Sequence, residues 1–179
     1  MMTRFEYIAL DGRMGYYRPF SKEWVLDWLL KTEQYYLRKY VRLLRSEEYF
    51  TSIRPDKVRR MWYFRRKNIL GAKLGFFIPA GCFGPDLKIA HYGSIIVNPH
   101  ARIGAGCTLH GNCCIGNKGL EPSDGDSPVI GNNVNIGQGA QILGPIMIAD
   151  GVTVGAGTIV VKSIEQANAV IVGSTNRML

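Results

Sequence analysis

A six-residue period in the second half of the chain limits the folds that this half can adopt. Aliphatic residues recur at every sixth position in two runs, first at Val97, Ile103, Leu109 and Ile115, and then at Ile130, Ile136, Ile142, Ile148, Val154 and Val160. A period of six suits neither an α-helix nor a strand with alternating faces. It suits a chain wound into a triangular coil, with one short strand on each side, the aliphatic residue pointing inward and a turn at each corner.

A second position of the repeat supports the same interpretation. Four places after the aliphatic residue a compact residue recurs, at Ala101, Cys107, Cys113, Val134, Ala140, Val152 and Thr158. Three repeats make one coil of about 18 residues, so equivalent positions stack about 4.8 Å apart as neighbouring parallel strands. We therefore expect Cys107 and Cys113 to be small buried residues with inert thiols.

The repeats resemble those of the hexapeptide acyltransferases. Sequence motifs typical of that family are found in Ile136-Gly137 and in Val154-Gly155-Ala156-Gly157. The resemblance covers roughly residues 76–179 and implies a mainly β fold, a left-handed parallel β-helix with an N-terminal α-helical region. The expected division is a basic helical region, 1–75, and an acyltransferase domain, 76–179, with a loop at 117–129 and a C-terminal tail at 163–179.

Two helices are expected before residue 75. Ser21 suits the N-cap of the first, whose apolar stripe comprises Val25, Trp28, Leu29, Tyr36, Tyr40, Leu43 and Leu44. Pro55 suits the first position of the second, which has Val58, Met61, Trp62 and Ile69 on one face. Packing in the core explains aromatic residues at this spacing, and Gly71 and Gly75 are expected to end the helix.

The charge is concentrated in the helical region. Residues 1–75 carry 17 Lys and Arg against 8 Asp and Glu, whereas residues 76–179 carry 5 against 6. An anionic partner such as a phosphorylated substrate, a membrane surface or a nucleic acid is one explanation, and two solvated helical faces are the explanation we favour. No nucleic-acid partner and no stable membrane insertion are expected.

The cysteines and the N-terminus indicate the compartment. None of the four cysteines lies in a C-x-x-C pair, so we expect reduced thiols. Residues 1–10 lack the apolar core of a signal peptide, and no apolar run is long enough to span a bilayer. A cytoplasmic location is the expectation.

His91 is the candidate catalytic residue. It lies six residues before Val97, at the inward position that aliphatic residues occupy elsewhere, and a break in a consistent pattern often marks function. One coil further on, His110 is expected beside it, so the two imidazoles form a candidate acid–base site next to the loop at 117–129. His100 is expected to point outward and to be inert.

The segment from Ile89 to Val97 is similar to the serine acetyltransferase branch of the family, including its polysaccharide O-acetyltransferase relatives. The resemblance implies an acetyl-CoA-dependent O-acetyltransferase with His91 as general base. His110 would orient the acceptor or share the proton, or it is a solvated corner residue, and both interpretations stay open. Acetyl-CoA is implied as the acyl donor substrate, and a homotrimer with its sites between neighbours is implied as the assembly.

The resemblance also implies positions that bind the donor. These are Gln138, Ala156, Val161, Lys162 and Arg177, of which the two cations suit the phosphates of coenzyme A. No metal is expected, because the three histidines occupy different positions of the repeat. They cannot converge as the zinc ligands of the carbonic anhydrases with this fold do.

The acceptor is the least constrained part of the prediction. Ala90 stands where serine acetyltransferases have an aspartate, Asp126-Ser127 where they have an Arg-His pair, and Phe76 where they have the aspartate that orients the base. A serine carboxylate would then lack a partner. A sugar hydroxyl of a cell-surface polysaccharide precursor is the expected acceptor, contacted by Asp124 and Asp126. Serine O-acetylation in cysteine biosynthesis and a non-catalytic β-helix scaffold are the alternatives.

Overall fold

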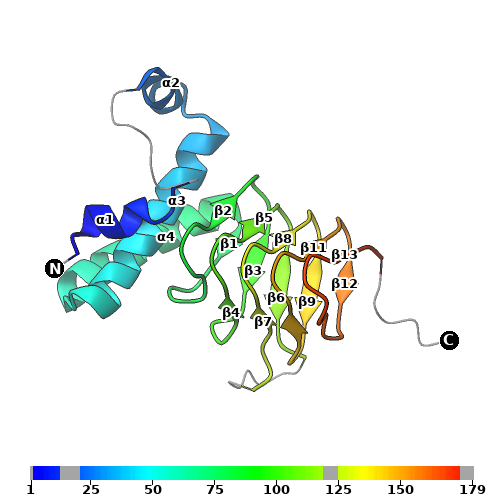
Figure 1. Ribbon diagram of the computed structural model, residues 1–179. Coiled ribbons are helices and arrows are strands. Elements are labelled where there is room, and N and C mark those ends of the chain that lie inside the picture. Colours follow the sequence, from blue (N-terminus) through cyan, green and yellow to red (C-terminus); the bar gives the residue numbers. More distant parts are fainter. Residues whose placement is uncertain (1, 13–20, 119–124, 174–179) are drawn as a thin grey trace.

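The computed structural model describes residues 2–12, 21–118 and 125–173. Helices gather at one end of a coil of parallel strands (Figure 1). The helices are α1 (Arg4–Ala9), α2 (Lys22–Leu30), α3 (Glu33–Glu48) and α4 (Lys57–Leu74), with a π-helical turn, η1 (Tyr49–Ile53), between the last two. None of the helices in the described part of the chain is long and apolar enough to cross a membrane.

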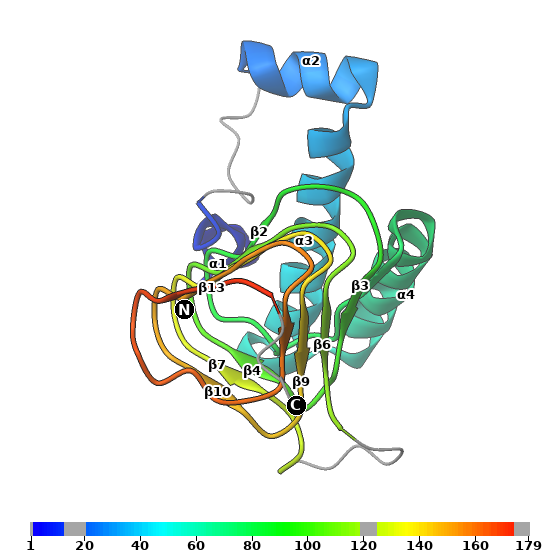
Figure 2. The ribbon, with the colours of Figure 1, turned by 90° about the vertical axis from the view of Figure 1, so that its right-hand side faces the viewer.

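The strands form three parallel sheets that the chain visits in rotation. Sheet A has the order β1 (Phe76–Phe77), β3 (Ile95–Val97), β6 (Cys114–Gly116), β9 (Gln141–Leu143) and β12 (Ile159–Val160). Sheet B contains β4 (Arg102–Ile103), β7 (Val129–Ile130) and β10 (Met147–Ile148). Sheet C contains β2 (Lys88–Ile89), β5 (Thr108–Leu109), β8 (Asn135–Ile136), β11 (Thr153–Val154) and β13 (Val170–Ile171). The three sides wind around one core (Figure 2), which fits the expected β-helix.

The repeat sets the register of the coil. Ile142 pairs with Val160, 18 residues later, whereas Ile115 pairs with Ile142, 27 residues later, because the loop is inserted between β6 and β7. The ten aliphatic positions are all buried, and so are the compact positions that follow them. Cys113 lies 2% exposed with its thiol directed at the His110 carbonyl, 2.7 Å away, so the predicted structural role of this cysteine is confirmed.

The coil extends further toward the C-terminus than the repeat indicates. Ile164 forms a parallel bridge with Ile148, and β13 pairs with β11, joining Ile171 to Val154. The segment predicted as a tail therefore contributes to sheet C as far as Ile171. The aliphatic spacing of six is lost here because Ile164 follows a shorter corner and Ile171 a longer one.

The first predicted helix is two helices. Lys31 adopts a left-handed conformation with φ 51° and ends α2, and Thr32 caps α3 by accepting a hydrogen bond from the Tyr35 amide. The expected single apolar stripe is split as well. Tyr40 is 1% exposed in α3, whereas Trp28 is 49% exposed and α2 buries none of its residues.

The second predicted helix buries the face opposite to its predicted apolar stripe. It begins at Lys57 after an Asp56 N-cap, so the prediction that Pro55 takes the first position is wrong. It ends at Gly75, as predicted, but Gly71 lies inside it. A Cβ on Gly71 would approach the Phe76 carbonyl to 2.7 Å, so glycine allows the close contact between α4 and sheet A. Val58, Met61, Trp62 and Ile69 are 46–80% exposed, because the helix buries Lys67, Leu70 and Gly71 instead.

Helices and coil share one apolar core and a buried ion network. The core runs from Leu37, Tyr40 and Leu44 of α3 into the coil. Arg45 pairs with Asp11 at 2.6 Å and with Glu48 at 2.8 Å, all with side chains at most 6% exposed. Burial alone disfavours its charge, but Glu48 and Asp11 outweigh this and raise the Arg45 pKa above its usual value.

The same charged groups bind the backbone of the first coil. Arg45 donates to the carbonyls of Phe83 and Gly84, and Lys67, which is paired with Glu47, donates to the Ile78 carbonyl. In the other direction, the Gly81 amide donates to Glu48 and the Leu87 amide donates to Asp11. The helices are thereby joined to the coil by polar contacts as well as by packing.

Candidate active site

His91 lies in an enlarged corner of the coil. Ile89 pairs with Leu109, 20 residues later, so this coil is two residues longer than the repeat. Ile89, which is fully buried, takes the inward position predicted for His91. The extra residues belong to the corner between β2 and β3, where Gly93 has φ 123°. The prediction that His91 points inward is therefore wrong, and its side chain is 65% exposed.

A carboxylate from the helical region faces His91. Glu33, the first residue of α3, lies with Oε2 3.4 Å from Nδ1 of His91. Its Oε1 accepts a hydrogen bond of 2.7 Å from the Tyr92 amide, which fixes the carboxylate against the corner. Burial and the nearby Glu33 charge raise the pKa of Tyr92, so the phenol stays neutral. A carboxylate that faces Nδ1 favours the tautomer with its proton on Nδ1, which leaves Nε2 as an acceptor.

His110 lies beside His91, as the sequence predicts. The ring centroids are 6.3 Å apart with the planes inclined by 44°. His110 follows β5 and is half-buried, and its Nε2 lies 3.2 Å from Oδ1 of Asn135 on β8. The Asn135 amide therefore fixes the His110 ring, whereas Glu33 contacts the His91 ring.

Two of the predicted donor-binding residues lie on the same edge of the coil as the histidines. Gln138 follows β8 and Ala156 follows β11, at the corner from sheet C to sheet A that also carries His91 and His110. Ile136 pairs with Val154, and the Gly157 amide donates to the Gln138 carbonyl at 2.8 Å, so the two corners stack directly. Both residues are exposed, and together they extend an accessible edge away from His91.

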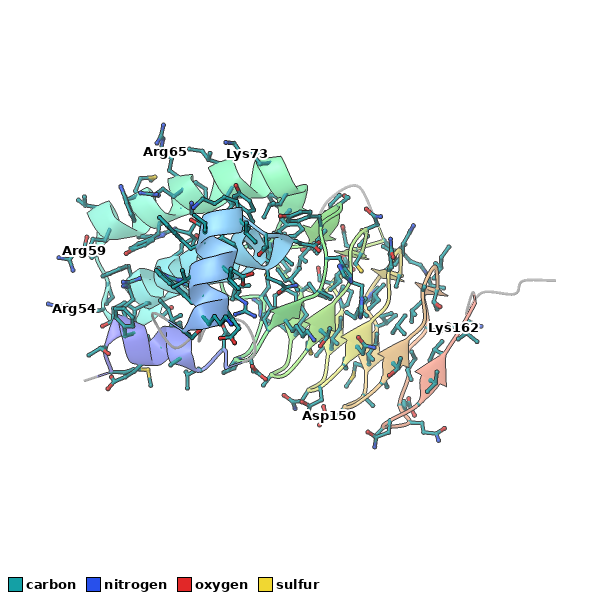
Figure 3. All side chains as sticks on the ribbon, turned by 90° about the horizontal axis from the view of Figure 1, so that it is seen from above. Arg54, Arg59, Arg65, Lys73, Asp150 and Lys162 are labelled. Atoms are coloured by element: carbon teal, nitrogen blue, oxygen red, sulfur yellow. The ribbon has the colours of Figure 1, made fainter. Side chains whose placement is uncertain are left out.

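The other predicted residues lie on a different edge. Val161 and Lys162 follow β12, at the corner from sheet A to sheet B, and Figure 3 shows Lys162 near the far end of the coil. The described ends of the predicted loop, 117–118 after β6 and 125–128 before β7, lie at the same corner, as does the segment that carries His100. These ends do not lie beside His91, where the loop was predicted. Asp126 is exposed there, and Arg177 and Asp124 lie outside the described residues.

Metal-ligand clusters and reactive thiols are the other kinds of site that the described residues could offer. Across residues 2–12, 21–118 and 125–173, no group of three His, Cys, Asp or Glu side chains is arranged to hold a metal ion. Burial raises the pKa of the Cys82 and Cys113 thiols to about 11, which disfavours the nucleophilic thiolate.

Glu33 is the residue of this site that sequence reasoning missed. It lies 58 residues before His91, and nothing in the local pattern connects the two. The one available signal is Thr32 followed by an acidic residue, which is typical of a helix start. That signal would have located the beginning of α3 but not its proximity to His91.

Comparison with known proteins identifies the type of repeat that builds the coil. Residues 127–162 match the family model described as bacterial transferase hexapeptide (six repeats). The chain carries hexapeptide repeats, and it is similar to serine acetyltransferases. Serine acetyltransferase of Buchnera aphidicola is 35% identical over 86 residues, which are 48% of this chain and 33% of the relative. That of Synechococcus elongatus is 29% identical over 101 residues, 56% of this chain and 41% of the relative.

Solved structures extend the likeness to the helical region. Neisseria gonorrhoeae serine acetyltransferase has a TM-score of 0.70 at 22% identity, with 95% of this chain and 63% of that chain covered. Soybean serine acetyltransferase complexed with serine has a TM-score of 0.72 at 22% identity, covering 96% and 66%. At this identity the likeness establishes the fold alone. This hexapeptide-repeat chain spans about a third to two fifths of the length of the curated relatives named above.

Proposed function

We propose that the chain transfers an acetyl group from acetyl-CoA to the hydroxyl of a small acceptor, with His91 as general base. The observation that carries the proposal is the arrangement of Glu33, His91 and His110 at the head of the exposed edge formed by Gln138 and Ala156. The hexapeptide repeats and the serine acetyltransferase relatives support the reaction class.

In the proposed reaction, Nε2 of His91 removes the proton from the acceptor hydroxyl as its oxygen attacks the thioester carbonyl. An alcohol is a weak nucleophile at neutral pH, so a positioned base accelerates this step by about 10²–10⁴-fold. The tetrahedral oxyanion collapses with cleavage of the C–S bond, and protonated His91 returns its proton to the leaving thiolate. Glu33 holds the imidazole in the required tautomer and stabilises the imidazolium that forms.

Serine is the acceptor that the relatives favour. The curated relatives and solved structures are named serine acetyltransferases, and none of those reported above supports the polysaccharide acceptor expected from the sequence. The Asp126-Ser127 pair supplies no cation for a serine carboxylate, and Lys118 of the loop follows β6, at the corner that does not carry His91. We propose that the basic helical region, which meets the site through Glu33, supplies that charge.

We further propose that a complete site needs a second copy of the chain, in a homotrimer. Support comes from the two edges of the coil, because His91, Gln138 and Ala156 lie on one corner and Lys162 on another. Within one chain the two corners lie at opposite ends of the strands of sheet A, whereas the corners of neighbouring coils can face each other. An exposed His91 would be enclosed by such a contact.

The decisive experiment is release of coenzyme A thiol from acetyl-CoA by wild type, His91→Ala and His100→Ala, with L-serine and with hexoses and nucleotide sugars as acceptors. We expect His91→Ala to lower kcat by about 10²–10⁴-fold. His100, on the other corner, provides the matched control and should stay within about twofold of wild type. Near-normal turnover by His91→Ala contradicts the role of His91. Turnover with sugars but not serine contradicts the acceptor. If calorimetry detects no binding of acetyl-CoA, the chain is not an acetyltransferase, and the non-catalytic β-helix scaffold is the remaining alternative.

A further inference from the structure

The outer face of α4 combines exposed apolar side chains with an excess of positive charge. Residues 57–74 contain seven Lys and Arg residues and no Asp or Glu. Apart from Lys67, which is buried against Glu47, these cations are exposed. Arg65 and Lys73 project from α4 away from the rest of the molecule in Figure 3.

The exposed apolar side chains of α4 lie on the same side of the helix as Arg65 and Lys73. Val58 is 80% exposed, Met61 64% and Ile69 46%. Their spacing of three and eight residues along the helix places them on one side, opposite the buried Leu70 and Gly71. Trp62, 50% exposed, lies at the border of this stripe, and Arg66 lies over its ring at 4.5 Å. We call Val58, Met61, Trp62, Arg65, Ile69 and Lys73 the α4 surface.

Two hollows on either side of Trp62 are also lined by cations. One, of about 380 Å³, lies between α3 and α4 and includes Lys39, Arg65, Arg66 and Lys73. The other, of about 430 Å³, includes Arg4 and Arg59. Among the described residues that line these two hollows there is no carboxylate. Each hollow therefore offers several donors to an anionic oxygen at the edge of an apolar surface.

We propose that the α4 surface docks the protein on an anionic phospholipid bilayer, with α4 lying in the plane of the interface. The removal of apolar side chains from water lowers the free energy, and the acyl region of a bilayer offers them an apolar environment. The flanking Lys and Arg residues and the tryptophan match the groups that bind lipid phosphates and the headgroup layer. α4, of 18 residues, is about 27 Å long, so a single contact can engage several headgroups.

Charge complementarity favours an anionic bilayer over a second copy of the chain or a nucleic acid as the partner of the α4 surface. A second copy related by a two-fold axis would bring the same cations of two α4 surfaces together, which is repulsive. As an interface of the proposed homotrimer, the α4 surface would instead face the coil of a neighbour, whose residues 76–179 carry only six Asp and Glu against five Lys and Arg. A nucleic acid would satisfy the cations through its phosphates but would leave Val58, Met61 and Ile69 in water. An anionic bilayer satisfies both kinds of side chain at once.

Co-sedimentation with vesicles tests the proposal without requiring acetyl transfer, so its result is independent of the proposed function. The vesicles contain phosphatidylcholine alone or with about 30 mol % phosphatidylglycerol, in low salt, where surface attraction is least screened. We expect binding to the anionic vesicles only. The double variant Arg65→Glu/Lys73→Glu should bind at least about 30-fold more weakly, because each basic residue near an anionic leaflet contributes roughly fivefold.

A matched control makes the same change of net charge on the coil. Lys88→Glu/Arg102→Glu reverses two exposed cations of β2 and β4 and should leave vesicle binding within about twofold of wild type. The apolar variant Met61→Ser/Ile69→Ser should also weaken binding, by about tenfold or more, because two apolar side chains no longer enter the interface.

Five outcomes overturn the proposal. The first three are no binding to anionic vesicles in low salt, equal losses in the α4 and coil variants, and unchanged binding of the apolar variant. A change in the oligomeric state of Arg65→Glu/Lys73→Glu by sedimentation would assign the α4 surface to a second copy of the chain. Displacement of vesicles by an excess of duplex DNA, with DNA binding that the apolar variant retains, would assign it to nucleic acid.

Discussion

Replacing Glu33 by glutamine removes one negative charge from the candidate active site and little else. The amide oxygen of the introduced glutamine can still accept the Tyr92 amide hydrogen, so the corner keeps its contact with α3. The charge facing Nδ1 of His91 is lost. If Glu33 stabilises the imidazolium that forms when His91 takes a proton, the variant raises the barrier of that step alone.

The expected magnitude follows from the distance and the exposure. Two unit charges 3.4 Å apart attract by about 1.2 kcal/mol in water and about 5 kcal/mol at an effective dielectric constant of about 20. The His91 side chain is 65% exposed and that of Glu33 34%, so a value near the lower end applies. We expect kcat to fall by about 10–30-fold, with the KM for acetyl-CoA unchanged, because the contacts of Glu33 are to His91 and Tyr92 and not to Gln138 or Ala156.

Steady-state kinetics on a double-mutant cycle with His91→Ala provides the test. Glu33→Gln should have no further effect when His91 is absent, since the carboxylate acts through the imidazole. Glu23→Gln is the matched control, because Glu23 is likewise an acidic residue in the first turn of a helix, and it is exposed. Full activity of Glu33→Gln, or an equal loss in both His91 backgrounds, would refute the reasoning.

Three further predictions concern the donor, the ion network and the thiols. Lys162→Ala should raise the KM for acetyl-CoA with kcat largely intact, and an unchanged KM would show that its charge is only solvated. Arg45→Met should lower the free energy of unfolding in urea by about 3–5 kcal/mol, because two buried carboxylates lose their partner, whereas exposed Arg42→Met should change it by less than about 0.5 kcal/mol. Native Cys82 and Cys113, with the pKa of each raised to about 11, should resist thiol reagents at neutral pH. The unfolded chain releases these two protons at lower pH than the folded one, so stability should fall as pH rises from about 9 to about 11, and a flat urea midpoint over that range would contradict this.

The coil could be predicted because its instructions are local and repeated. The burial of each inward residue, from Val97 to Val160, follows from the same short pattern. A wrong prediction in one repeat therefore does not affect the prediction for the next. The sense of winding is not encoded in that pattern. It rests on the resemblance to hexapeptide acyltransferases and on the likeness of the fold to solved structures.

The site was only partly predictable because it depends on exceptions to the repeat. Two extra residues between Ile89 and Leu109 move His91 out of the inward position, and counting by sixes cannot detect them. The partnership with Glu33 arises from packing between segments far apart in the chain. Helical periodicity likewise identified a stripe on α4 but not its direction, since Val58 and Leu70 are both apolar and only tertiary contacts decide which is buried.

The ion network at the helical end of the coil also bears on how the protein aggregates. In a stack of parallel strands, the first coil has backbone N–H and C=O groups with no preceding coil to pair with, and such edges recruit strands from other molecules. Asp11, Arg45, Glu48 and Lys67 occupy several of these groups and act as a surrogate for the missing coil. Detachment of the helices should therefore produce end-to-end association of chains whose strands are still folded. Heating should give light scattering before the β-sheet signal in circular dichroism is lost.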